Sequence, residues 1–373
     1  MKLPAYILFI TLIIMGLFFR KNKWVSIVLL SYMWVLNALN TYTPDYHSYE
    51  AVFNGNYYGL NMDSGFTLIC SLFRLIGCTY QQFRMIWAML YVLLVGNFTF
   101  KCSKNPNFVF SMMLICPILL DISGIRSSVA YLIVLNFGLL LKKPTLYNKF
   151  WFVIGIFIGA SIHISAIFYL IFLLTEIKMT RKKMAGILLG SIFLTIFVRS
   201  DLFTQIVSLI YDVTGIYAIQ KWLLGGSMNT YPNLIGFLSV VVPLVGLVFL
   251  SLKEKEYILR KSMFSVSDQA PLVLDRKTIL FLNNIGGLMF FLVPVIAIST
   301  EGRRLLFGTL LAYYCLTSNC FSINSTSTKM NIYSLKYASI ELVLIMGTLW
   351  IYMYSYQSHD VFAALYNNML FGG

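Results

Sequence analysis

The sequence of 373 residues has few charged residues, and this shortage decides which class of protein it encodes. Asp, Glu, Lys and Arg make up 11% of the chain, whereas soluble domains carry about 25%. Hydrophobic residues make up 59%, and the mean hydropathy is +0.78. A soluble globular protein is excluded. The composition predicts an all-α, polytopic membrane protein that forms a single integral membrane domain over residues 1–373.

Several signatures of chemistry are also missing. The chain has three His and contains no HExxH or DxD motif, so no metal site is expected. It has no P-loop, which argues against transport driven by nucleotide hydrolysis. Its six Cys form no CxxC pair, and their apolar surroundings indicate buried small side chains. We therefore expect no cofactor.

Basic residues outnumber acidic residues by 28 to 14, and they gather in clusters. In a membrane protein such clusters mark cytoplasmic loops, so nucleic acid is not an expected partner. The clusters are Arg20/Lys21/Lys23, Lys101/Lys104, Lys142/Lys143/Lys149, Lys178/Arg181/Lys182/Lys183, and the run from Lys253 to Lys277. The last cluster lies in a predicted cytoplasmic loop, residues 253–277.

Apolar runs separate these clusters and predict about 11–13 transmembrane or re-entrant helices. The first run is followed by Arg and Lys instead of a small-residue cleavage site, so we expect it to be retained as a span. The runs are Leu3–Phe19, Trp24–Leu39, Met85–Phe100, Phe108–Leu120, Ser127–Leu141, Phe150–Thr175, Met184–Val198, Leu234–Leu252, Thr278–Ser299, Leu305–Leu316 and Tyr337–Tyr354.

All the basic clusters can lie on one side of the membrane only if two segments are unusual. Residues 64–83 must lie along the outer surface or enter the membrane and return, within a periplasmic loop and interfacial segment at 40–84. The run at 150–174 must be a helical hairpin broken near His163, where GASIHIS interrupts it. A periplasmic amphipathic helix is expected near 200–225, in a periplasmic loop at 199–230.

This topology leaves a particular set of residues at the outer face, in which Arg and carboxylates dominate and Lys is nearly absent. A guanidinium can hold phosphate or carboxylate through two parallel hydrogen bonds, whereas an ammonium acts as a point charge. The outer set is Asp45, His47, Glu50, Asp63, Arg74, Arg84, Arg126, His163, Arg199, Glu301, Arg303 and Arg304.

The loop YTPDYHSYE, residues 42–50, combines carboxylates with aromatic residues. It is either a connector whose Tyr side chains sit at the level of the lipid headgroups or a sugar site. In a sugar site, aromatic faces pack against sugar rings and carboxylates accept hydrogen bonds from hydroxyl groups. Asp45 would then be the general base. The expected substrate-binding residues of the loop are Tyr42, Tyr46, His47, Tyr49 and Glu50.

Arg126 follows a break at Gly124 and stands at the start of an apolar helix that Ser127 or Ser128 would cap. A guanidinium beside a helix N-terminus suits a phosphate group, because the free backbone N–H groups and the helix dipole add to its charge. The alternative is an Arg that extends to the lipid headgroups. The residues leave both readings open.

The other candidates also have two readings. His163 is either a hydrogen-bonded packing residue or a functional group, since ionisable residues inside a membrane usually mark a site. Glu301, Arg303 and Arg304 form either a structural ion pair or a second anion clamp. Arg74 and Arg84 are further expected substrate-binding residues.

Together these segments resemble the EpsG family of Wzy-like polysaccharide polymerases. The similar features are YTPDYHSY (42–49), DSGFTLI (63–69), GIRSSVA (124–130) and ASIHISAIF (160–168). The resemblance extends over residues 40–175 and then becomes weaker. Ser127 stands where the family usually has Gln, which argues against a role for a Gln amide but leaves Arg126 in place.

The resemblance implies a multi-pass enzyme of the bacterial inner membrane whose active site faces the periplasm. Such an enzyme joins oligosaccharide repeat units carried on undecaprenyl pyrophosphate into O antigen, capsule or exopolysaccharide. Its partners would be the lipid-linked donor and acceptor, membrane lipid, a chain-length regulator and a flippase. Asp45, Arg126 and His163 would be catalytic. Nucleotide and metal would not be needed, since Arg offsets the charge of the leaving group.

Two other functions fit the sequence. A flippase for lipid-linked sugars would need polar residues along a route between both leaflets, whereas the candidate residues here are predicted on one side. A ligase that transfers finished O antigen to the lipopolysaccharide core uses the same donor and similar chemistry. The residues separate the ligase from the polymerase poorly.

Overall fold

A computed structural model of the chain describes residues 2–41, 43, 45–56, 63–177, 179–198, 200–214, 276–298, 302–320 and 363–369, with isolated helical residues at 245–246, 343–344 and 347. Most of these residues are helical, and among them no β-strand occurs beyond an isolated bridge between Asn40 and Asn368. The predicted all-α class is confirmed. Of the predicted loops at 199–230 and 253–277, residues 215–230 and 253–275 lie outside the described residues, as do most of the predicted spans Leu234–Leu252 and Tyr337–Tyr354.

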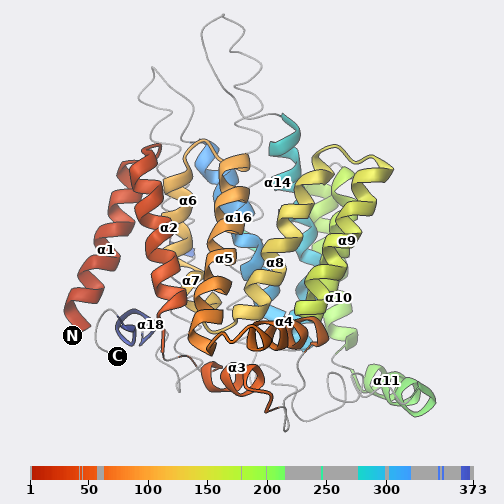
Figure 1. Cartoon of the computed structure of the whole chain (residues 1–373). Helices are drawn as coiled ribbons and strands as arrows, with labels where there is room; N and C mark the ends of the chain where they lie inside the picture. The colour runs from red at the N-terminus through yellow and green to blue at the C-terminus, as the bar shows by residue number, and fades with distance from the viewer. Residues whose placement is uncertain are drawn as a thin grey trace, which may run out of the picture.

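The longer described helices form a bundle, and the short helices α3 and α4 lie across one of its ends (Figure 1). They are α1 (Lys2–Phe18), α2 (Lys23–Ala38), α3 (Tyr46–Phe53), α4 (Ser64–Leu75), α5 (Tyr80–Cys102), α6 (Pro106–Ile115), α7 (Ile118–Asp121), α8 (Ile125–Gly138), η1 (Leu139–Lys142), α9 (Leu146–Ile162), η2 (Ile164–Glu176), α10 (Arg181–Val198), α11 (Asp201–Thr214), α14 (Arg276–Leu288), η4 (Met289–Leu292), α15 (Val293–Ile298), α16 (Gly302–Cys320) and α18 (Ala363–Tyr366).

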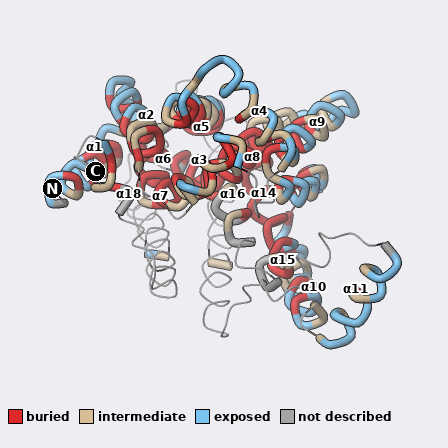
Figure 2. Tube along the Cα trace, turned by 60° about the horizontal axis from the view of Figure 1, so that its bottom comes forward, coloured by how far each residue is buried: buried red, intermediate tan, exposed pale blue. Residues whose placement is uncertain are grey.

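Several of these helices are long and apolar enough to cross a membrane. Among the described residues they are Tyr80–Cys102, Ile125–Lys142 and Arg276–Val295, and the bent pair Lys182–Val198 and Asp201–Val213 would be one more. Shorter apolar helices, such as α2 and α9, lie beside them. Figure 2 shows buried positions concentrated in α8 and exposed positions along α9 and α11 at the edge. Lipid-facing apolar residues explain that exposure.

The ends of α1 and α5 and the starts of α2, α6 and α9, which carry the first three basic clusters, lie at one end of the bundle, which is the upper end in Figure 1 and is called here the basic end. The Asn107 side chain donates hydrogen bonds to the carbonyls of Phe19 and Asn22, which joins the first cluster to the second. The Lys142 ammonium lies 3.5 Å from the carbonyl oxygen of Lys101, which joins the second cluster to the third. Among the described residues, the first three basic clusters therefore share one end.

The predicted hairpin broken near His163 is confirmed. His163 ends α9 and directly precedes η2, and the two helices pack along each other. Their lengths match, because 17 α-helical residues and 13 residues of 3₁₀ helix each rise about 26 Å. An ion pair between Lys149 and Glu176 joins the two outer ends of the hairpin. His163 consequently lies at the end of the bundle opposite the basic end.

Two short helices cover this second end, which is called here the arginine end. Figure 1 shows α4 lying across the bundle, with α3 below it. Gly65 lets α4 approach α9 closely, since a Cβ there would come within 2.6 Å of the Ser161 carbonyl oxygen. The predicted amphipathic helix is present as α11, bent by 70° from α10. The arginine end is thus the end at which α3, α4 and the His163 break meet.

Candidate functional site

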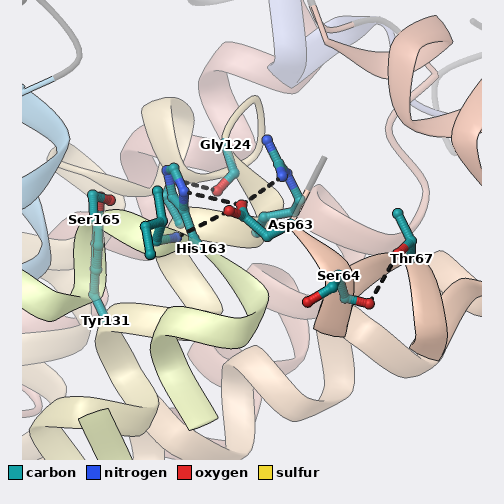
Figure 3. Close-up of polar contacts among 10 residues, drawn as sticks. Asp63, Ser64, Thr67, Gly124, Tyr131, His163 and Ser165 are labelled. Atoms are coloured by element: carbon teal, nitrogen blue, oxygen red, sulfur yellow. Dashed lines mark hydrogen bonds and ion pairs between the residues drawn. The ribbon is translucent and has the colours of Figure 1, made fainter. Parts of the chain in front are cut away.

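The Asp63 carboxylate lies at the centre of a polar cluster at the arginine end. Its Oδ2 is 2.9 Å from Nη1 of Arg126 and 3.5 Å from Nδ1 of His163. Its Oδ1 accepts a hydrogen bond of 3.3 Å from the backbone N–H of Ile164. Figure 3 shows the Asp63 side chain pointing from the start of α4 toward His163. Three segments that are distant in the sequence therefore meet at one carboxylate.

Both acidic residues of the site occupy the N-cap position of a short helix without capping it. Asp45 precedes α3 and Asp63 precedes α4, yet neither side chain hydrogen-bonds to the first turn of its helix. An N-cap hydrogen bond stabilises a helix by about 0.5–2 kcal/mol. Each carboxylate instead pairs with an Arg of the bundle. A local rule that is broken twice in the same way is typical of a functional site.

Arg126 stands in the first turn of α8 and is held on several sides. One terminal nitrogen pairs with Asp63, and the guanidinium carbon lies 5.6 Å from the centre of the Tyr49 ring and 5.5 Å from that of Phe66. Its side chain is only 14% exposed. Its Nε is buried and makes no hydrogen bond to the described residues. The group is thus oriented while part of its donor capacity remains unused.

The two serines after Arg126 do not cap α8 as expected. The helix begins at Ile125, so Ser127 and Ser128 lie inside its first turn. Their hydroxyl groups donate hydrogen bonds to the carbonyl of Gly124. The expectation was wrong because the helix begins two residues before the serines. The N–H groups of the first turn consequently have no side-chain cap.

Arg304 approaches the same helix start from α16. Its Nη2 lies 3.5 Å from Oδ2 of Asp45, and the two side chains are 32% and 36% exposed. A Cβ at Gly124 would lie 3.5 Å from Nη1 of Arg304 and 2.8 Å from Oγ of Ser127. Glycine therefore leaves room for the guanidinium. Two Arg side chains, each beside a carboxylate, therefore meet at the N-terminus of α8.

Tyr131 and Tyr169 support the site from inside the bundle. The Tyr131 ring stacks on His163, with ring centres 6.0 Å apart, and its hydroxyl is 2.7 Å from Oγ of Ser165 (Figure 3). The Tyr169 hydroxyl donates a hydrogen bond of 2.6 Å to the carbonyl of Leu305, the residue after Arg304. These contacts fix the positions of His163 and Arg304 relative to each other.

The remaining predicted residues lie around α3 and α4. Nη2 of Arg84 donates to the Asn37 carbonyl at 2.8 Å, and Nη1 of Arg74 donates to the Phe53 carbonyl at 2.9 Å. These contacts hold the end of α2 to α5 and the end of α3 to α4. Neither contact involves the Asp63 cluster. Oε2 of Glu50 lies 3.4 Å from Nδ1 of His47, whose side chain is exposed.

Aromatic residues complete the inner face of α3. The guanidinium carbon of Arg84 lies 4.9 Å from the centre of the Tyr46 ring. Burial raises the pKa of Tyr49, so its phenol stays neutral beside Arg126. The backbone of Arg303 belongs to α16, while Tyr42 and Glu301 lie outside the described residues.

Asp63 and Tyr131 were not among the predicted site residues. The signal for Asp63 was its place in the DSGF segment, which resembles the family, but an Asp before a helix start is ordinarily an N-cap. Nothing in the local sequence marked Tyr131. In the described part of the chain, no group of three or more His, Cys, Asp or Glu side chains is placed to hold a metal ion.

A comparison with protein families decides where the chain belongs. The model of the EpsG family matches residues 23–368, which include every residue of the cluster. The chain belongs to the EpsG family. Membership in the EpsG family points to a polysaccharide polymerase-like role. No curated protein and no solved structure matches the chain.

The two Arg–carboxylate pairs differ in burial, which predicts different effects on stability. Asp63→Asn leaves the mostly buried Arg126 without its counter-charge and should lower the free energy of unfolding by about 2–4 kcal/mol. Asp45→Asn affects a more exposed pair and should cost less than about 1 kcal/mol. Thermal unfolding of both purified variants in detergent measures the difference. Equal thermal unfolding midpoints for Asp63→Asn and Asp45→Asn would contradict the claim that Asp63 contributes more to stability than Asp45.

Proposed function

We propose that the protein is a glycosyltransferase that polymerises oligosaccharide repeat units carried on undecaprenyl pyrophosphate into O antigen or exopolysaccharide. The observation that carries this proposal is the convergence of Arg126 and Arg304 on the uncapped start of α8, beside His163. A lipid diphosphate supplies the matching anion. The family membership supports a polymerase of this kind.

The diphosphate would bind where the positive groups meet. The Arg126 side chain is 14% exposed and that of Arg304 is 32% exposed, so an entering anion would approach both guanidinium groups from their exposed sides. The first-turn N–H groups of α8 add further donors. As the glycosidic bond breaks, charge builds on the departing phosphate oxygen. Donors aimed at that oxygen lower the barrier by about 3–4 kcal/mol each.

The reaction forms a bond between C1 of the donor sugar and an acceptor hydroxyl oxygen, while the bond from C1 to the phosphate oxygen breaks. The hydroxyl proton must pass to a base, and we assign this base to His163. The carboxylate of Asp63 beside Nδ1 orients the imidazole and stabilises its protonated form, so that Nε2 can accept the proton. The lipid diphosphate leaves with the bonding electron pair.

In this proposal Asp45 binds sugar, and the role of base that the sequence suggested for it passes to His163. Its pairing with Arg304 places it next to the proposed diphosphate site, and its exposure allows it to accept a hydrogen bond from a sugar hydroxyl. Tyr46, His47 and Glu50 on the adjoining helix α3 would contact the sugars. Tyr42, Glu301 and Arg303 remain proposed contacts of the same substrates.

We further propose that the arginine end faces the periplasm and that the protein resides in the bacterial inner membrane. The positive-inside rule assigns the basic end to the cytoplasm. The separation of the two ends supports this orientation, because Lys101 and Lys142 lie together while Asp63, Arg126 and His163 meet at the other end. The lipid-linked substrates would then be joined outside the cell.

Substitution of Arg126 tests the proposed function. Arg126→Ala and Arg126→Lys should both reduce polymer formation by a hundred-fold or more, on the order of the loss of one such donor, because Lys cannot hold two phosphate oxygens. Each variant is expressed in a strain that lacks the protein. The polysaccharide ladder on gels should shorten to a single repeat unit on the lipopolysaccharide core, with normal protein in the membrane.

The same strain separates the alternatives. Bare core in the strain without the protein would indicate a lost ligase or flippase and would overturn the polymerase. A full ladder from Arg126→Ala at a normal protein level would remove Arg126 from the diphosphate site. His163→Gln serves as the second variant, since it keeps a polar side chain of similar size and should abolish polymer if His163 is the base.

The orientation predicts which positions react with an impermeant thiol reagent. In a background without the native Cys, Asn56→Cys lies on an exposed position just after α3 and should be labelled in intact spheroplasts. Lys143→Cys is exposed at the basic end and should react only after the membrane is opened. Mass spectrometry of the purified protein measures the labelled fraction. The reverse pattern would contradict the periplasmic site.

A further inference from the structure

An apolar groove of about 710 Å³ lies on the bundle away from the Asp63 cluster. The end of η2, helix α10 and η4 form its walls, with Leu174, Ile177 and Phe291 among the lining residues. Ile177 directly follows Glu176, which pairs with Lys149. The groove therefore begins at the basic end and runs along α10 toward the middle of the bundle.

Two glycines keep the floor of the groove open. Gly186 and Gly190 are one turn apart on α10, and a Cβ at either position would meet no atom within 4 Å. Phe193, one turn further along the helix, is 74% exposed at the rim. Among the described residues that line the groove, Lys183 and Ser191 have polar side chains. A chain of apolar atoms would complete the packing that this surface lacks.

The lining of the groove suits a hydrocarbon chain. From Lys183 to Phe193 the helix rises about 15 Å. An extended chain of apolar carbons can lie along that length over Gly186 and Gly190, where no side chain fills the floor.

Charge at one end of the groove selects the class of lipid. Lys183 lines the groove and stands in the first turn of α10, where its backbone N–H bonds to Oγ of Thr180. Its ammonium and the N-terminus of α10 both attract an anion. We infer that the groove holds one acyl chain of an anionic phospholipid, whose phosphate group lies at Lys183. This site is separate from the proposed catalytic site.

Binding of defined phospholipids to the purified full-length protein tests this inference. The probes are a phosphatidylglycerol and a phosphatidylcholine with the same acyl chains, and native mass spectrometry measures the bound fraction. Phosphatidylglycerol should bind more tightly to the unaltered protein. Lys183→Gln should weaken its binding about five-fold, as expected for one Lys at an anionic surface, because the charge at the groove is lost.

The neighbouring residue provides the matched control. Lys182 is also exposed but does not line the groove, so Lys182→Gln should leave binding nearly unchanged. A Cβ at Gly190 would meet no atom within 4 Å, so Gly190→Leu should fill part of the floor and reduce binding of both lipids. Equal effects of the two Lys substitutions, equal binding of the two lipids, or no effect of Gly190→Leu would overturn the inference. Displacement of phosphatidylglycerol by a polyprenyl diphosphate at equal concentration would also overturn it, since the occupant would then be the substrate lipid.

Discussion

The ion pair between Asp63 and Arg126 determines the arrangement of the arginine end. Removing two charges from water costs several kcal/mol per ion, and the pair compensates only through close contact and additional hydrogen bonds. Asp63 meets this demand with its contact to Arg126 and a hydrogen bond from the backbone N–H of Ile164, and Nδ1 of His163 lies 3.5 Å from the same carboxylate. The start of α4, the start of α8 and the α9–η2 break are thereby fixed together, and α3 packs over them through Tyr49.

The bundle separates two kinds of cationic side chain between its ends. Lys residues at the basic end provide charge without a fixed geometry, which is sufficient for orientation in a membrane. Arg126 and Arg304 at the other end are each paired with a carboxylate, so their guanidinium groups are oriented before any substrate arrives. Such preorganisation matters for catalysis, because the site does not have to rearrange as charge develops. The exposed Arg304 pair would open more readily than the buried Arg126 pair.

Periodicity and charge were sufficient to predict the all-α fold, the break near His163 and the amphipathic helix α11, because each depends on the local pattern of apolar and charged residues. The convergence at Asp63 was not predictable in this way. It depends on how α4 lies across the bundle, and an Asp before a helix start is usually a cap. The roles of Arg74 and Arg84 were hidden for a similar reason, since their acceptors are backbone carbonyls of distant segments.

Reconstitution tests the central claim most directly. The purified protein is placed in liposomes with a synthetic oligosaccharide on undecaprenyl pyrophosphate, without nucleotide and with a chelator present, and chain length is measured by gel electrophoresis or mass spectrometry. The account predicts polymers with release of lipid diphosphate from the unaltered protein, and single units from Arg126→Ala and His163→Gln. Absence of polymer from the unaltered protein, or equal polymer from the Arg126→Ala variant, would contradict it.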